Sequence, residues 1–136
     1  MSSIIEGTYK LLSFSLEKEN GTVEYPFGKD AIGYINYTGS GHFSVQYMPR
    51  HQQADNWKGV SYFGTYEYNR EKDYIVHHVE GSLFSSEEGL DKIIHSRVRG
   101  KSLKLTCPTP TAGGKTEEAA TIHFEKQEVL PPVTVF

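Results

Sequence analysis

The chain has 136 residues, a net charge of -3 and 37% hydrophobic residues, which fits one folded domain spanning residues 1–136. The acidic balance excludes a general nucleic-acid binder, which would need a basic surface, and no run of like charges indicates a membrane-surface patch. Tyr occurs 9 times, Phe 7 times and Gly 13 times, a composition typical of half-buried strands joined by tight turns.

The start of the chain lacks a basic segment followed by an apolar run, and no apolar stretch is long enough to span a bilayer. Cys107 is the single cysteine, so an internal disulfide is excluded, and we interpret it as a small buried hydrophobe. These features predict a cytoplasmic protein.

Short β-type runs separated by Gly, Asn or Asp dominate the chain. In chain order they cover residues 8–16, 31–37, 42–48, 60–68, 74–83, 92–98, 102–107 and 119–126. Residues 38–41 read as a tight hairpin loop with two glycines, and the polar stretch 49–57 is the best candidate for a lid. Residues 108–118 read as an exposed loop.

Residues 127–136 form an extended apolar tail that should dock on this protein or on a partner. We find no amphipathic helix and no internal repeat. Successive hairpins without crossover helices predict an all-β, antiparallel, up-and-down barrel of about eight or more strands, because closure removes exposed strand edges. An open sandwich is the structural alternative.

Most predicted strands carry polar and apolar side chains on both faces. Mixed faces rich in tyrosine suit a barrel whose interior holds an apolar ligand and a few polar anchors. The alternative is that tyrosine is simply common in strands, with its hydroxyl in solvent. The residues predicted to bind a ligand in the interior are Tyr34, Tyr47, Tyr62, Tyr66, His77, His78 and Arg97.

His77, His78 and Glu80 form the strongest polar cluster on one strand and are the catalytic candidates, although none is assigned a catalytic role. Alternation requires one histidine to point inward, where it could act as a general base or hydrogen-bond a ligand. If His78 and Glu80 face inward they join Tyr74. If His77 does, it is a lone polar anchor among apolar neighbours. The alternative role for either histidine is purely structural.

No metal site or cofactor is predicted. His42, His78, His95 and His123 lie on different strands and have no metal-binding spacing. An inward Arg97 could hold a carboxylate, as a fatty-acid-like ligand would require, but the simpler interpretation is a solvated charge near a turn.

Five segments resemble the bacterial and fungal lipocalin-like domain proteins: Gly7–Phe14, Tyr25–Tyr34, Tyr37–Gln46, Tyr62–Tyr66 and Val76–Glu80. The stretch YPFGKDAIGY is the most specific. The resemblance implies a lipocalin-like barrel and a general role in binding or processing small molecules.

This sequence departs from the family pattern in two places. Tyr9 stands where the family usually has Trp, and either ring could plug the barrel floor. The stretch 93–99 is less like the family, so the resemblance assigns no role to His95 or Arg97.

Three functions remain open at this point. The first is binding of a small, largely apolar or amphipathic molecule inside the barrel. The second is a cofactor-independent enzyme of isomerase, cyclase or hydratase type that uses an inward histidine with tyrosine. The third is an interaction module whose apolar tail forms a homodimer.

Overall fold

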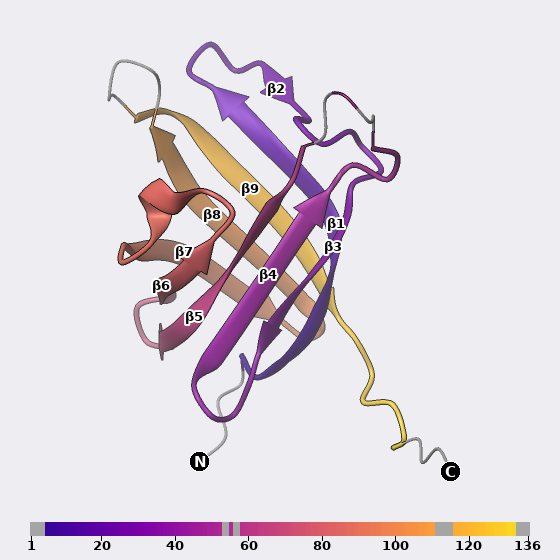
Figure 1. The fold of residues 1–136 in the computed structure, drawn as a ribbon, viewed down its shortest axis with the longest axis vertical. Coiled ribbons are helices and arrows are strands. Elements are labelled where there is room, and N and C mark those ends of the chain that lie inside the picture. Colours follow the sequence, from indigo (N-terminus) through magenta and orange to yellow (C-terminus); the bar gives the residue numbers. More distant parts are fainter. Residues whose placement is uncertain (1–4, 53–54, 56–57, 111–115, 133–136) are drawn as a thin grey trace.

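The computed structural model describes residues 5–52, 55, 58–110 and 116–132. Within these residues the chain is almost entirely strand, with a single short 3-10 turn, η1 (Ser85–Glu87) (Figure 1). The strands are β1 (Gly7–Lys18), β2 (Val23–Glu24), β3 (Ile32–Tyr37), β4 (His42–Met48), β5 (Val60–Asn69), β6 (Tyr74–Ser82), β7 (Asp91–Arg99), β8 (Ser102–Pro110) and β9 (Thr116–Lys126).

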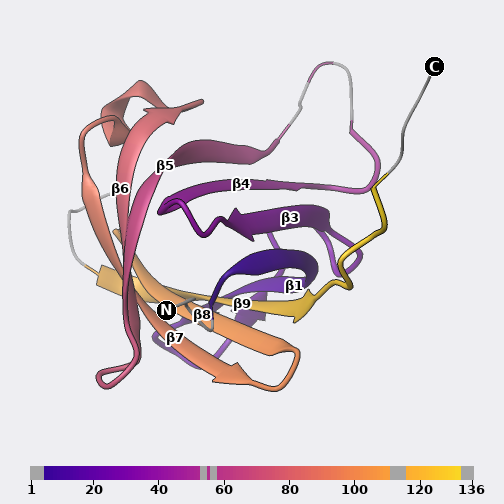
Figure 2. The same ribbon diagram turned by 90° about the horizontal axis from the view of Figure 1, so that it is seen from below.

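The strands form one antiparallel sheet. From β3 to β9 each strand pairs with the next in the sequence, whereas the short β2 pairs only with the end of β1 and β1 pairs with β3. β1 also pairs with both β3 and β9, so the sheet closes into a barrel of eight strands with β2 as an extra strand. Figure 2 shows these strands surrounding a common interior. The predicted all-β, up-and-down barrel is confirmed.

The barrel has two distinguishable ends. The hairpin end carries the turns after β3, β5 and β7, and Gly41, Asp73 and Gly100 take up positive φ angles of 87°, 53° and 58° there. The opposite end carries the connections 19–31, 49–59 and 83–90, and we call it the η1 end. The predicted lid at 49–57 belongs to this end, but residues 53–54 and 56–57 lie outside the described residues.

Alternate side chains from every barrel strand fill the interior. The largest fully buried ones are Tyr9, Tyr37 and Phe124, which come from three different strands. The remaining fully buried side chains are mostly Ile, Leu and Val, with His77 as the polar exception. The core formed by these residues is therefore almost completely shielded from water.

Three register shifts interrupt the strand pairing of the described residues. One lies in β1 between Leu11 and Ser13, another between β5 and β6 at Phe63 and Gly64, and the third in β8 between Thr109 and Pro110. In β6 the extra residue is Glu80, because Gly64 pairs with Val79 while Phe63 pairs with Gly81. A bulge reverses the inward and outward pattern beyond it, so simple alternation fails for the last residues of β6.

The C-terminal tail leaves the barrel beside the start of β1, where the Gln127 amide donates to the Thr8 carbonyl at 2.8 Å. Beyond that point Val129 is 97% exposed and Leu130 is 81% exposed. Of the two predicted alternatives, docking on the protein's own surface does not hold for Val129 and Leu130, and docking on a partner stays a prediction. Residues 133–136 lie outside the described part. Within it, no helix is both long and apolar enough to cross a bilayer.

Candidate functional site in the barrel interior

The residues predicted to line the interior divide between the two faces of the barrel wall. Tyr47 and Tyr62 are buried inside, and Tyr66 packs against the core while its hydroxyl donates to the Thr38 carbonyl at 2.8 Å. His77 is inside and fully buried.

The other predicted residues lie outside. Tyr34 is 44% exposed, the His78 side chain is 33% exposed on the outer wall, and Glu80 and Arg97 are exposed. The inward alternative for His78 with Glu80, and the inward alternative for Arg97, are therefore wrong. The wall of the barrel separates these residues from His77, so the eight candidates do not form one site.

His77 occupies the middle of the interior, held by aromatic side chains from neighbouring strands. Its Nε2 lies 2.6 Å from the Tyr37 hydroxyl, and its Nδ1 lies 3.3 Å from the Tyr62 hydroxyl. The imidazole ring stacks on Phe43, with ring centroids 4.1 Å apart and an interplanar angle of 16°. Both ring nitrogens and one ring face of His77 are therefore satisfied by aromatic residues of the core.

The His77 ring is neutral. Burial, and to a smaller extent the nearby charges of Lys92 and His78, lower its pKa from 6.5 to about 3. A neutral imidazole has one N–H donor and one acceptor nitrogen. One of the two tyrosines therefore donates to His77 while the other accepts from it. Tyr37, His77 and Tyr62 thus form a directional hydrogen-bonded chain.

The tyrosines of this chain remain protonated. Burial is the main cause that raises the pKa of both Tyr37 and Tyr62 well above 10, and the electrostatic influence of other phenols or of Cys107 adds to it. Tyr47, which is also buried, has its pKa raised for the same main reason. The interior therefore offers neutral hydroxyl groups that can donate or accept hydrogen bonds, and no phenolate.

A charged pair lies beside this chain at the η1 end. Lys92 pairs with His77 across β6 and β7 and shares its inward face with Ile94. The Lys92 ammonium lies 4.6 Å from the centroid of the Tyr62 ring and contacts the carboxylate of Glu87. The side chains of Lys92 and Glu87 are only 29% and 23% exposed. A charged pair in this position is partly desolvated, which is costly unless the pairing is close.

The bulge at Glu80 completes this arrangement. Beyond it Ser82 pairs with the inward Tyr62, and the Ser82 hydroxyl donates to the Glu87 carboxylate at 2.9 Å. The sequence analysis missed Lys92, Glu87 and Ser82. The inward position of Lys92 could have been found from strand alternation, because Lys92 lies two residues before Ile94 and four before Ser96, both of which are buried.

Cys107 lies close to the same group. Burial raises the pKa of its thiol, and the Lys92 charge acts in the opposite direction. Its electrostatic influence on Tyr47 and Tyr62 places all three residues in one neighbourhood. The thiol is therefore protonated and mostly buried, in agreement with the interpretation of Cys107 as a small hydrophobe.

Apolar side chains continue from Tyr47 towards the η1 end. The Phe14 ring lies 5.5 Å from the Tyr47 ring and 5.0 Å from the Phe27 ring, measured between centroids. Phe14, Phe27, Val60 and Cys107 are only partly buried against the core. We call Phe14, Phe27, Val60 and Cys107 the apolar platform. Tyr47 and Cys107 connect it to the neighbourhood of Tyr62 and Lys92, and apolar side chains beside a charged group suit an amphipathic molecule.

The outer wall carries a separate cluster around His78. Its Nδ1 lies 2.6 Å from Asp91 Oδ1 and its Nε2 lies 2.6 Å from Glu67 Oε2. The hydrogen bonds that His78 makes to Asp91 and, with a smaller effect, to Glu67 raise its pKa. Each ring nitrogen faces a carboxylate acceptor, so the arrangement favours the charged imidazolium, which donates from both nitrogens.

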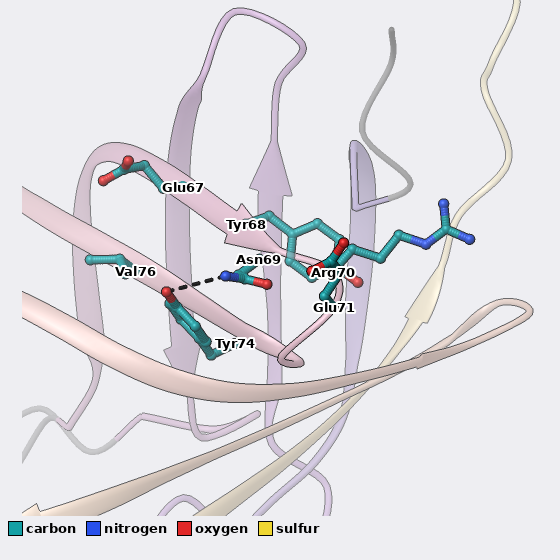
Figure 3. A pocket seen from close by; sticks show the side chains of 7 residues that line it. All are labelled: Glu67, Tyr68, Asn69, Arg70, Glu71, Tyr74 and Val76. Atoms are coloured by element: carbon teal, nitrogen blue, oxygen red, sulfur yellow. Dashed lines mark hydrogen bonds between the residues drawn. The ribbon is translucent and has the colours of Figure 1, made fainter.

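A pocket on the outer wall lies at the β5–β6 hairpin (Figure 3). Its lining is polar, and one hydrogen bond, from the Asn69 amide to the Tyr74 hydroxyl at 3.4 Å, joins the side chains drawn. Arg70 extends away from Tyr74 rather than into a shared centre (Figure 3). This pocket lacks the convergent, buried groups found in the interior, so we do not consider it the main site.

The described residues contain no group of three or more His, Cys, Asp or Glu side chains placed to hold a metal ion. His42 is engaged with Ser40 instead, with 2.9 Å between its Nδ1 and the serine Oγ. The four histidines considered above therefore do not converge.

Comparison with known proteins gives one match. Residues 6–54 match a family model described as a lipocalin-like domain, which confirms the resemblance over β1 to β4. The resemblances of Tyr62–Tyr66 and Val76–Glu80 fall outside this match. No curated protein and no solved structure matches the chain.

Proposed function

We propose that this lipocalin-like barrel binds a small amphipathic molecule at its η1 end. The apolar body of the molecule rests on Phe14, Phe27 and Tyr47, and its polar group meets the Tyr62 hydroxyl and Lys92. The observation that carries the proposal is the inward Lys92, whose ammonium lies 4.6 Å from the Tyr62 ring centroid in a largely apolar interior. Packing alone does not explain a lysine that points inward, because a hydrophobic residue of similar size would fill the same space without the desolvation cost of a charge.

The location differs from the interior site expected from the sequence. His77 has no accessible surface, and Tyr37 and Phe43 close it off from the hairpin end. A ligand that reached His77 from the hairpin end would have to displace Tyr37 and Phe43, which would disrupt the hydrophobic core. At the η1 end, by contrast, Lys92, Cys107 and Phe14 keep part of their surface accessible. This difference favours the η1 end.

A second candidate function is catalysis of a proton transfer at the same place. The observation that favours it is the chain from Tyr37 through His77 to Tyr62, which links a buried base to a hydroxyl near Lys92. Tyr62 would be the group that touches the substrate, and His77 would be a positioning residue. We place binding first because Lys92, Phe14 and Cys107 keep accessible surface at the η1 end, whereas His77, on which the proton transfer depends, has none.

A chemical-shift titration tests the proposal. A library of small aromatic and aliphatic amphipathic molecules is added to ¹⁵N-labelled protein, and native mass spectrometry of the purified protein is run in parallel to detect a retained ligand. We expect saturable amide shifts around Tyr47, Tyr62, Lys92 and Cys107. Lys92→Met should weaken them, whereas the outer-wall control Lys104→Met should not. Shifts confined to the outer wall, or an absence of saturable binding across the library, would overturn the proposal.

A further inference from the structure

The charged pair at the η1 end has two unequal partners. Lys92 belongs to β7 and is fixed by pairing with His77 on β6. Glu87 belongs to η1, a three-residue turn that contains no buried residue. Leu83, Phe84 and Leu90, which flank η1, are 56%, 51% and 48% exposed. The cation is therefore part of the barrel wall, whereas the carboxylate is supplied by a segment with little apolar anchorage.

The segment 83–90 is attached mainly through its ends. The Leu83 amide donates to the Ser61 carbonyl at 3.0 Å, and Val79 exchanges backbone hydrogen bonds with Gly89 and Leu90 at 2.8 and 2.9 Å. Between these points Glu87 is bound to the barrel through Ser82 and Lys92. Moving the Glu87 carboxylate away from Lys92 would therefore break two side-chain contacts and leave the strands intact.

The Tyr62 side chain, whose ring centroid lies 4.6 Å from the Lys92 ammonium, carries a hydroxyl that is a further donor. The shorter contact of His77 is with Tyr37, at 2.6 Å against 3.3 Å for Tyr62. If the Tyr37 hydroxyl donates the short bond to Nε2, the Nδ1–H of His77 donates to the Tyr62 oxygen. The Tyr62 proton is then free to point away from His77. An acceptor bound at Lys92 would receive both an ammonium and a hydroxyl hydrogen bond.

We infer that the molecule bound at the η1 end carries an anionic group of the carboxylate type, and that this group replaces Glu87 on Lys92 while accepting a hydrogen bond from Tyr62. The inference rests on the proposed function and adds the chemical class of the ligand. Glu87 holds the place of the ligand's anion in the free protein, so that Lys92 keeps a partner in both states. Exchange of one carboxylate for another keeps Lys92 paired while Glu87 moves into solvent, whereas a neutral ligand that displaced Glu87 would leave Lys92 without a partner.

A matched pair of probes tests the inference by isothermal titration calorimetry. 2-Naphthoate and 2-naphthylmethanol share the same aromatic body and differ in the charge of the polar group. For the unmodified protein we expect naphthoate to bind about tenfold more tightly than the alcohol, the ratio that one partly desolvated charge-assisted contact supports. Binding of the alcohol at equal or greater affinity overturns the inference but leaves the proposed function in place. Binding of neither probe overturns both.

Three variants sharpen the result, each checked for its fold by circular dichroism. Lys92→Met should abolish the preference for naphthoate. Glu87→Gln should strengthen naphthoate binding by about threefold or more without changing the affinity for the alcohol, because the competing carboxylate is removed. Lys104→Met, which removes an exposed charge from the outer wall, should alter neither. A preference that survives Lys92→Met, or an unchanged naphthoate affinity in Glu87→Gln, would overturn the inference.

Discussion

His77 and His78 are adjacent in sequence and experience opposite environments. His77 has no exposed surface and contacts two tyrosine hydroxyls, whereas His78 lies on the outer wall between two carboxylates. Burial lowers the pKa of His77 to about 3, and hydrogen bonds to Asp91 and Glu67 raise that of His78. The comparison shows that the protonation of a histidine in a barrel depends on which side of the strand its side chain occupies. Because adjacent residues point to opposite sides, one position along the chain changes the direction of the pKa shift.

The largest expected effect is on stability. His77→Leu removes both hydrogen bonds and leaves the buried Tyr37 and Tyr62 hydroxyls without their partner, which we expect to cost about 2–4 kcal/mol. His78→Leu removes only exposed ion pairs and should cost about 1 kcal/mol or less. Urea unfolding followed by fluorescence measures both. Equal losses in the two variants would contradict the contrast between them.

A double variant separates lost hydrogen bonds from lost packing. In the His77→Leu background, Tyr37→Phe removes one of the two buried hydroxyls that have lost their hydrogen-bond partner. This double variant should therefore be more stable than His77→Leu alone. If Tyr37→Phe instead lowers the free energy of unfolding further, the loss in His77→Leu comes from packing and the hydrogen-bond explanation is wrong.

The next effect is on titration. The pKa of His77 is lower in the folded protein than its ordinary value of 6.5, so the unfolded chain binds more protons between about pH 3 and 6.5. The contribution of His77 therefore makes the protein less stable as pH falls through this window. His78 behaves in the opposite way, because its folded pKa is raised. Its stabilisation is fully present below pH 6.5 and is lost as pH rises through the folded pKa.

Histidine ring resonances followed by NMR check both directions. His77 should keep the shifts of a neutral ring down to about pH 5, and His78 should titrate with a midpoint above 6.5. The same histidines in the urea-unfolded chain provide the reference. A His77 ring that becomes charged close to pH 6.5 in the folded protein would show that it is not enclosed as described.

The smallest effect concerns the carboxylates beside His78. Asp91→Asn and Glu67→Gln should each lower the pKa of His78, and Asp91→Asn should lower it more because its hydrogen bond is the larger cause. Unfolding free energies should change by only about 0.5 kcal/mol, since these carboxylates are 64% and 74% exposed. The His77 resonances serve as an internal control, and a shift there would reveal a wider rearrangement.

Much of the fold could be predicted from the sequence because the strands have clear β-type residue patterns and the turns between them contain glycine. The predicted strand 42–48 coincides with β4, and Gly41 has the positive φ expected of its hairpin. β2 was missed because two residues carry no periodic pattern. Which histidine faces inward could not be decided, since both faces of β6 contain apolar and polar residues.

The candidate site was harder to predict than the fold. Alternation places Ser82 on the same face as His78, but the bulge at Glu80 moves Ser82 to the inside. Gly64 accompanies this bulge, because a Cβ there would lie 1.9 Å from the His78 carbonyl oxygen. Lys92 was overlooked because a charged residue is ordinarily expected to face solvent. Contacts created by a bulge and a short turn therefore lie beyond pattern reasoning.

The pairing of β1 with β9 has a consequence for how the protein is made. Ser15 and Thr121 are register partners although 106 positions separate them. The barrel therefore cannot close on a ribosome until β9 has emerged, and β1 waits with an unpaired edge for most of synthesis. Such long-range pairing places folding in the slow, millisecond-to-second class of all-β domains. The nascent chain should depend on chaperones during that interval, and weakening of the β1–β9 seam should appear first as poor yield from cells rather than as altered binding.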